Sequence, residues 1–221
     1  MKVTRHDIVV PEFTAELLDA WSVVPAAVAS DALGRFEGMA GAISPLAPGT
    51  RLVGRARTVK CMVGDNSALH AAIGLCKSGL DVLVCNAQGF EDSALFGGLM
   101  TRASLEQGVV GLVIDGAVRD AAEIVESGFP CYCRAIVPRG PHKGCGGVID
   151  GTISCGGVPV SSGDLVIGDD DGITIVPYGE LETTMERVQE ILAKEQRALS
   201  SIAEGGSLAE VYGVPEITLI P

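Results

Sequence analysis

An arginine and an aspartate stand side by side at Arg119 and Asp120, shortly after an apolar segment. Residues 109–114 are rich in β-branched side chains and bounded by glycines, which predicts a buried strand. The Asp115-Gly116 pair predicts a tight turn after that strand, and residues 119–126 have the pattern of a helix. Open α/β sheets bind ligands at strand–turn–helix junctions of this kind.

The chemistry available to this pair is cation and anion binding. Asp120 could hold a divalent cation, because Mg²⁺ takes one or two protein carboxylates and completes its shell with water and substrate oxygens. Arg119 could bind a substrate carboxylate or oxyanion with two parallel N–H groups. The structural alternative is an aspartate stabilised by the helix dipole beside a surface ion pair. The segment alone slightly favours this alternative.

A second candidate is the run Gly97, Gly98, Leu99 and Met100, which begins a predicted helix. Backbone N–H groups at a helix N-terminus bind carboxylates, and two glycines allow a ligand to approach closely. The alternative is a glycine-rich turn that serves only backbone geometry.

Other polar residues give weaker signals. Asp65 and Asn66 could form a second edge of a pocket or could equally cap a helix. His70 lies among apolar residues at helical spacing and is expected to be packed rather than catalytic. The acidic run at 169–171, followed by Gly172, lacks the ligand spacing of a calcium loop, so a hairpin turn is expected.

Composition limits the possible classes of protein. The 221 residues are 47% hydrophobic, which suits one domain spanning residues 1–221. A formal net charge of −12 argues against nucleic acid as a direct partner. The sequence shows no signal peptide and no apolar run of membrane-spanning length. Seven cysteines without a Cys-x-x-Cys pair suggest reduced, structural thiols, and a cytoplasmic location is expected.

The pattern of apolar residues predicts a parallel βαβ core followed by hairpins and a long helix. After Pro130 the short strands are expected to pair as hairpins rather than as further βαβ units. The tail at 208–221 is expected to pack on this domain or on a neighbour. Helices are predicted at 12–21, 25–34, 68–77, from 97, 119–126 and 180–203; strands at 51–63, 81–86, 109–114, 131–136, 158–160, 165–167 and 173–176.

These motifs, in their order and spacing, resemble the class II 4-hydroxy-4-methyl-2-oxoglutarate aldolases and the related regulators of ribonuclease E activity A (RraA). The resemblance implies an RraA-like layered α/β/β/α sandwich with a parallel βαβ core and a C-terminal helix, assembled as a homotrimer or hexamer. The segments that carry it are 30–33, 64–66, 97–100, 115–120, 162–164 and 168–172.

The resemblance also implies roles for the residues. Asp120 would hold Mg²⁺ or Mn²⁺, Arg119 would contact the substrate, and residues 97–100 would bind a substrate carboxylate. The implied activity is a metal-dependent lyase that cleaves a 2-oxo acid to pyruvate, by retro-aldol cleavage or by decarboxylation of oxaloacetate. A glutamate of the last helix, Glu190 or Glu195, could complete the site of an adjacent subunit.

The sequence departs from the aldolase pattern at one position. The aldolases carry an acidic residue 21 positions before the arginine, assigned to proton transfer, and this chain has Gly98 there. Glu91, Asp92 or Asp65 are conceivable replacements. The second candidate function is therefore a non-catalytic regulator that binds an RNA-degrading enzyme through an acidic surface. Such a role would explain the net negative charge and the absence of an acidic residue at position 98. It assigns no role to the adjacent Arg119 and Asp120.

Overall fold

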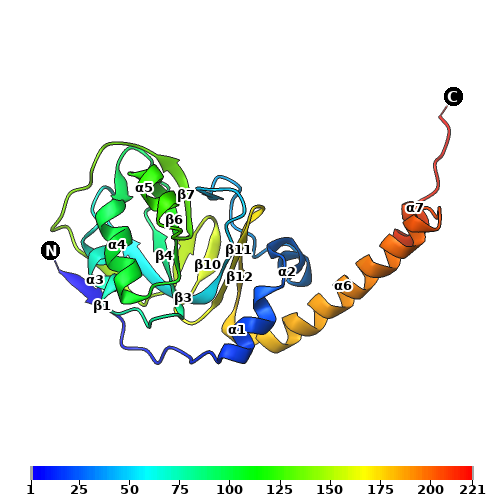
Figure 1. Cartoon of the computed structure of the whole chain (residues 1–221), viewed down its shortest axis with the longest axis horizontal. Helices are drawn as coiled ribbons and strands as arrows, with labels where there is room; N and C mark the ends of the chain where they lie inside the picture. Colours follow the sequence, from blue (N-terminus) through cyan, green and yellow to red (C-terminus); the bar gives the residue numbers. More distant parts are fainter. Residues whose placement is uncertain (1, 221) are drawn as a thin grey trace.

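The computed structural model describes residues 2–220 and has four layers in the order α/β/β/α, as expected (Figure 1). The first strand layer is built on parallel neighbours in the order β3-β4-β6-β7. Three helices connect these strands and cover one face of them (Figure 1). The strands are β3 (Leu52–Cys61), β4 (Asp81–Asn86), β6 (Gly111–Val118) and β7 (Cys131–Ile136), and the helices are α3 (Ser67–Ile73), α4 (Gly98–Gln107) and α5 (Ala121–Glu126).

The second strand layer lies on the opposite face. Its hairpin of β11 (Leu165–Asp169) and β12 (Gly172–Val176) is antiparallel, and β11 also pairs with β3. The expected turn is confirmed, because Asp169 pairs with Gly172 and Gly172 has a φ of 123°. A separate hairpin joins β9 (Ile153–Cys155) and β10 (Val158–Val160).

The outer helical layer covers β11 and β12 on the far side from the parallel strands. It consists of α1 (Ala15–Ser22), α2 (Ala26–Ala32) and the first half of α6 (Leu181–Ala203). The remaining short elements are β1 (Val3–Arg5), β2 (Ser44–Pro45), β5 (Ala94–Phe96), β8 (Gly147–Ile149), the 3₁₀ turn η1 (Tyr178–Glu180) and α7 (Leu208–Tyr212).

Strand β4 shows why the layers form. Successive side chains of a strand point to opposite faces, and both faces of β4 are apolar. Leu83 and Cys85 pack into the core beneath α3, α4 and α5. Val82 and Val84 pack into the core shared with the second strand layer. The continuous apolar sequence of this strand therefore reflects burial on both faces.

The expected turn at Asp115 and Gly116 is wrong, because β6 continues through both residues to Val118. The pairing of β6 with β7 shifts register between Ile114 and Ala117. A Cβ on Gly116 would lie 2.6 Å from the Cβ of Ala87, so the glycine permits close packing within an irregular strand.

The expectation of hairpins after Pro130 is wrong for the first strand of that region. Strand β7 runs parallel to β6, so β6, α5 and β7 form a third βαβ unit. The helix predicted at 119–126 is thus the crossover between two parallel strands, although α5 has only six residues. The later hairpins at β9-β10 and β11-β12 are confirmed.

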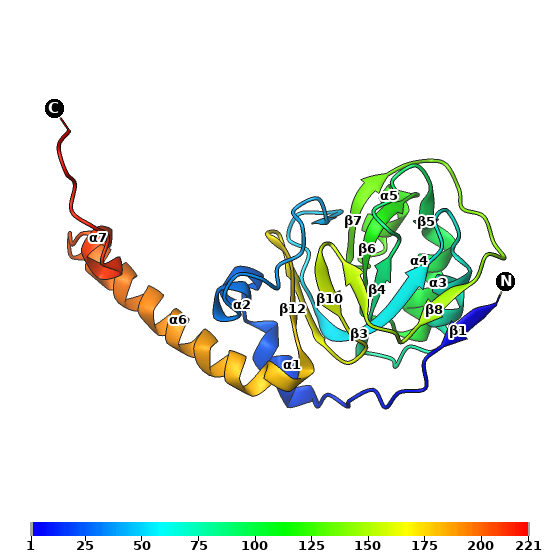
Figure 2. The ribbon, with the colours of Figure 1, turned by 180° about the vertical axis from the view of Figure 1, so that it is seen from behind.

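Helix α6 leaves the body beside α1 and α2 and carries the tail away with it (Figures 1 and 2). The first part of the tail packs on this arm of its own chain, where Lys194 Nζ lies 4.5 Å from the centre of the Tyr212 ring, whereas packing of the tail on a neighbour stays a prediction. Three apolar side chains of the tail, Ile217, Leu219 and Ile220, are more than nine-tenths exposed. No helix in the described part of the chain has both the length and the apolar character needed to cross a membrane.

A buried ionic network lies between β3, the start of β4 and the residue after β8. Arg55 Nη2 lies 2.7 Å and Arg57 Nη2 3.0 Å from the Asp81 carboxylate. Arg57 Nη1 also donates to Asp150 (2.9 Å), which accepts a further bond from the Ser162 hydroxyl (2.8 Å). The arginines on one face of β3 are thus paired rather than solvated, and removing one partner would leave a buried charge uncompensated.

Replacing Asp150 with alanine should lower the free energy of unfolding by about 3–5 kcal/mol. The buried Arg57 guanidinium would then be paired with Asp81 alone. Urea unfolding followed by circular dichroism measures this loss. Asp19→Ala, on the exposed side of α1, is the matched control and should change stability by less than about 0.5 kcal/mol. Equal stability of both variants would contradict the role of the network.

The same network should make the protein sensitive to acid. Burial alone would raise the pKa of Asp150, but bonds from Ser162, Arg5 and Arg57 outweigh it and hold the pKa below its ordinary 3.8. A lowered pKa adds stability that is complete above about pH 4 and is lost as the pH falls through the folded-state value. The free energy of unfolding should decrease as the pH is lowered from about 5 to 3. In Asp150→Asn this dependence of the unfolding free energy on pH should be weaker.

Candidate functional site

The predicted junction at Arg119 and Asp120 is present. Strand β6 ends at Val118, and Asp120 is the N-cap of α5 in a left-handed conformation (φ 55°, ψ 39°). Aspartate visits this conformation more readily than most residues. The Arg119 N–H donates to the Phe96 carbonyl (2.9 Å), which fixes the junction against the end of β5.

The N-terminus of α4 meets this junction directly. The Gly98 N–H donates to Asp120 Oδ2 (3.0 Å), and Arg119 Nε lies 3.5 Å from the same oxygen. A Cβ on Gly97 would lie 2.7 Å from Asp120 Oδ2 and 2.9 Å from Arg119 Cγ. Glycine at 97 is thus required for the close approach of both side chains. The structure brings together the two groups of residues that the sequence singled out.

Arg119 extends from Gly97 towards a third glycine that the sequence analysis did not single out. A Cβ on Gly140 would lie 2.8 Å from Arg119 Nη1. The side chains of Arg119 and Asp120 are 43% and 44% exposed, so both can reach a ligand. Gly140 lies between Arg139 and Pro141 in a loop whose only sequence signal was its glycine and proline content.

Arg119 and Asp120 open onto a cleft with two hollows. One, of about 90 Å³, lies between the α4 N-terminus and the segment around Asn66 and His70. The other, of about 320 Å³, follows the end of β7 at residues 136–138. Leu99 and Met100 also line the first hollow.

The Leu99 N–H is an open donor in the first hollow. It has no hydrogen-bond partner among residues 2–220, whereas the Gly98 N–H is used by Asp120 and the Met100 N–H by the Gly97 carbonyl (3.0 Å). Of the predicted carboxylate-binding amides, those of Gly97 and Leu99 therefore have no partner within the described chain, and that of Leu99 belongs to the first turn of α4.

Asn66 lines this hollow and carries a buried polar atom without a partner among residues 2–220. Its side chain is only 3% exposed, and its Nδ2 donates to the Leu95 carbonyl (2.9 Å) and to Met100 Sδ (3.4 Å). Its Oδ1 has no hydrogen-bond partner within the described chain. Leaving such an acceptor unsatisfied costs about 1–3 kcal/mol, so the atom suits a ligand that brings a donor.

Asp65 and Asn66, adjacent in sequence, have different roles. The Asp65 carboxylate is fully buried and accepts the N–H groups of Ser67 and Cys145 (both 2.9 Å). Burial alone would raise its pKa, but these bonds outweigh it and hold the pKa below its ordinary value. Asp65 therefore stabilises the loop before α3, and only Asn66 lines the hollow.

The expectation that His70 is packed among apolar residues is wrong. Its side chain is exposed and lines the first hollow. Burial and the nearby Lys143 ammonium lower its pKa. Lys143, which the sequence analysis did not single out, lines the same hollow from the loop after β7. Its position after His142 in a glycine-rich loop was the only available signal.

A cation at this site would depend on Asp120. No group of three or more His, Cys, Asp or Glu residues within 2–220 forms a metal-binding cluster. Mg²⁺ and Mn²⁺ do not need such a cluster, because water and substrate oxygens can fill most of their octahedral positions. The half-exposed Asp120 carboxylate at a polar cleft fits this kind of site.

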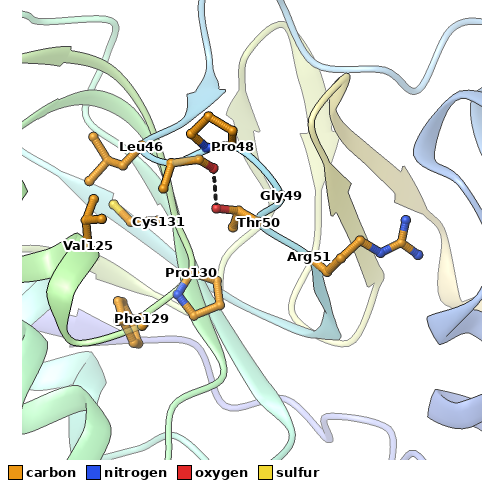
Figure 3. Close-up of a pocket in the computed structure, with 11 residues that line it drawn as sticks. Leu46, Pro48, Gly49, Thr50, Arg51, Val125, Phe129, Pro130 and Cys131 are labelled. Atoms are coloured by element: carbon orange, nitrogen blue, oxygen red, sulfur yellow. Dashed lines mark hydrogen bonds between the residues drawn. The ribbon is translucent and has the colours of Figure 1, made fainter.

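A separate hollow of about 260 Å³ lies between the loop after β2 and the end of α5. Figure 3 shows its wall of Leu46, Val125 and Phe129, with Arg51 pointing away from it. The Thr50 hydroxyl facing this region is already bonded to the Ala47 carbonyl (2.5 Å). The side chains that face this hollow are thus uncharged, whereas Arg119 and Asp120 present charged groups at the cleft.

Comparisons with known proteins agree with this architecture. The sequence profile of the RraA-like family (Aldolase/RraA) matches residues 14–175. A protein of Halalkalibacterium halodurans named "Putative 4-hydroxy-4-methyl-2-oxoglutarate aldolase" is 32% identical over 197 residues, covering 89% of this chain and 93% of that protein.

Two solved structures have the same fold. RraAS2 of Streptomyces coelicolor, described as an unusual member of the RNase ES inhibitor RraA protein family, has a TM-score of 0.75, 28% identity, and coverage of 87% of this chain and all of that one. An uncharacterized protein of Pseudomonas syringae has a TM-score of 0.80, 25% identity and coverage of 95% and 99%. This chain belongs to the RraA-like family.

Proposed function

We propose that the protein is a divalent-metal-dependent lyase that cleaves a 2-oxo acid and releases pyruvate. The observation that carries this proposal is the convergence of Arg119, Asp120 and the open Leu99 N–H around one cleft. The aldolase name of a 32% identical relative supports the same reaction class. The substrates we propose are 4-hydroxy-4-methyl-2-oxoglutarate, oxaloacetate or compounds like them.

Each group of the cleft has a task in such a reaction. Asp120 would hold Mg²⁺ or Mn²⁺, and the ion when bound supplies Lewis acidity that polarises the 2-oxo group. Arg119 neutralises the carboxylate next to that group and the negative charge that develops when the carbon–carbon bond breaks. The Leu99 N–H orients the same carboxylate, and the orphaned Asn66 Oδ1 accepts a donor from substrate or water.

Retro-aldol cleavage and decarboxylation both pass through the enolate of pyruvate. A site that stabilises this enolate can catalyse either reaction. The two reactions differ in the fragment that leaves, which is a carbonyl compound in the retro-aldol cleavage and carbon dioxide in the decarboxylation. The second hollow, along residues 136–138, has the volume to accept that fragment. We therefore place the pyruvate half at Arg119 and Leu99 and the leaving group at the end of β7.

Asp120→Ala should abolish metal-dependent pyruvate release from both substrates, a loss of at least about a hundredfold for a residue that holds the ion. The assay couples pyruvate to lactate dehydrogenase with Mg²⁺ or Mn²⁺. The matched control is Asp92→Ala, an exposed residue that does not line the cleft. Oxaloacetate also loses carbon dioxide with free metal, so equal rates for wild type and Asp120→Ala would refute the proposal.

Gly97→Ala should reduce the same activity by at least about tenfold, because its methyl group would displace Asp120 and Arg119 from each other's reach. The backbone of Gly97 is extended, so the effect would come from this contact and not from conformational strain. Gly41→Ala is the control, since nothing lies within 4 Å of a Cβ at that position. Full activity of Gly97→Ala with an unchanged melting temperature would contradict the geometry.

We also propose that the protein assembles as a homotrimer or a hexamer. Helix α6 extends beyond the body, and apolar side chains such as Leu199, Ile202 and Ile217 are about half or more exposed along this arm. Such surface suits burial against another subunit. Glu190 and Glu195 are exposed on α6, which lies in the outer helical layer on the other side of the strands from α4 and α5, so we propose that either serves a neighbouring subunit's site.

A non-catalytic role is the second candidate. It is favoured by the net charge of −12 and by the fold shared with a member of the RNase ES inhibitor RraA protein family. An acidic surface would bind a basic segment of an RNA-degrading enzyme. Stoichiometric recovery of a nuclease, without turnover of any 2-oxo acid, would favour this role over the lyase.

A further inference from the structure

A second carboxylate, besides that of Asp120, lies at the N-terminus of α4. Residues 97–100 have no acidic side chain, so this carboxylate comes from another helix. Glu123, in the first turn of α5, places its carboxylate against Gly98. A Cβ on Gly98 would lie 2.5 Å from Glu123 Cδ and 2.9 Å from Glu123 Oε1. Both distances are shorter than any that a Cβ atom keeps to a non-bonded neighbour in proteins. The carboxylate of Glu123 therefore fills the space that a side chain at position 98 would occupy.

The position of this carboxylate is fixed by an ion pair. Arg102, one turn into α4, donates from Nε to Glu123 Oε1 (2.9 Å), and its Nη2 lies 2.8 Å from the same oxygen. Both contacts use one oxygen. Glu123 Oε2 has no hydrogen-bond partner among the described residues, so it keeps its capacity to accept a proton.

Glu123 and Asp120 approach the same residue. The Gly98 N–H is bonded to Asp120 Oδ2 (3.0 Å), and the space beside its Cα holds the Glu123 carboxylate. The two acidic residues stand at the N-cap and third position of α5, so a single helical turn presents both. Asp120 lines the cleft beside Arg119, whereas the Glu123 carboxylate lies against Gly98, between Gly97 and Leu99 of the first hollow.

The other acidic residues near the cleft are committed elsewhere or lie outside it. Both oxygens of Asp65 accept backbone N–H groups. Asp115 is paired with Arg134 and accepts the Gly156 N–H (2.8 Å). Glu91 and Asp92 are exposed, and no hydrogen bond or ion pair within residues 2–220 joins either side chain to Arg119, Asp120 or the start of α4. Glu123 does not itself line either hollow, but its carboxylate lies against Gly98, between two residues of the first hollow, and keeps one oxygen free of partners in the described chain.

We propose that Glu123 carries the proton in the reaction, an inference that rests on the proposed lyase function. In a retro-aldol cleavage the Glu123 carboxylate accepts the proton of the C4 hydroxyl. The C4–O bond becomes a carbonyl, the C3–C4 bond breaks, and its electron pair forms the enolate of pyruvate. Glu123 then returns the proton to C3, which becomes the methyl group, and the carboxylate is restored. Such proton transfer contributes about 10²–10⁴-fold to a rate.

The direct test is exchange of the methyl protons of pyruvate for deuterium, followed by proton NMR with Mg²⁺ in D₂O. Glu123→Gln keeps the size of the side chain and should slow exchange by at least about a hundredfold. Pyruvate affinity and melting temperature should stay near wild type, which a merely structural role would not predict. Glu126→Gln, an exposed glutamate on the same helix, is the matched control and should exchange at the wild-type rate.

Two further variants separate the proton-transfer role from the ion pair. Arg102→Gln removes the pair but leaves the carboxylate, so exchange should fall by less than about tenfold. Moving the carboxylate should rescue activity: Gly98→Asp in the Glu123→Ala background should exchange at least tenfold faster than Glu123→Ala alone. Gly98 has no positive φ, so it accepts a side chain once Glu123 is shortened.

The outcomes distinguish failure of this inference from failure of the lyase. If Asp120→Ala abolishes exchange while Glu123→Gln leaves it unchanged, the lyase stands and Glu123 is not the proton carrier. Loss of exchange in His70→Gln, with Glu123→Gln active, would assign the proton to the opposite wall of the hollow. If wild type shows no exchange with Mg²⁺ or Mn²⁺, both the inference and the lyase are refuted.

Discussion

The site depends on the close approach of the end of β6 to the beginning of α4. Gly97 and Gly98 have no side chains, and the room this leaves is filled by Arg119, Asp120 and Glu123. The Gly98 N–H then fixes Asp120 Oδ2 in place. A methyl group at either glycine would displace a charged side chain. The geometry of the cleft therefore depends on the absence of a side chain at Gly97 and at Gly98.

This approach needs a rigid support, and the parallel strands supply it. Strands β4 and β6 are buried on both faces, with α3, α4 and α5 on one side and the second strand layer on the other. The charges of Arg55 and Arg57 are neutralised within the same support by Asp81 and Asp150. Buried pairs of this kind are costly to break, so they hold β3, the start of β4 and the end of β8 in a fixed relation.

Much of the fold was predictable from local patterns. The bounds of β4 at residues 81–86 agree with the predicted strand, and the 169–172 turn and the long helix up to Ala203 were recovered within a few residues. The errors arose where tertiary contacts override local signals. Asp115 and Gly116 look like a turn, yet their strand continues because Asp115 pairs with Arg134 on the adjacent strand.

The candidate site was predictable in part for the same reason. Arg119, Asp120 and the glycines at 97 and 98 stand out in sequence because they form short motifs. Glu123 and Gly140 do not, because their importance lies in which residues they face across the fold. The roles of Asp65 and Asn66 also needed the structure, since only their hydrogen bonds tell a loop-stabilising aspartate from an asparagine with an open acceptor.

The central claim is that Asp120 and the start of α4 together bind a divalent cation and a 2-oxo acid. A crystal structure with Mn²⁺ and oxalate, a stable mimic of the pyruvate enolate, tests this most directly. We expect an anomalous manganese peak at the Asp120 carboxylate, with oxalate between Arg119 and the Leu99 N–H. Manganese and oxalate bound elsewhere, or at this cleft without contact to Asp120, would contradict it.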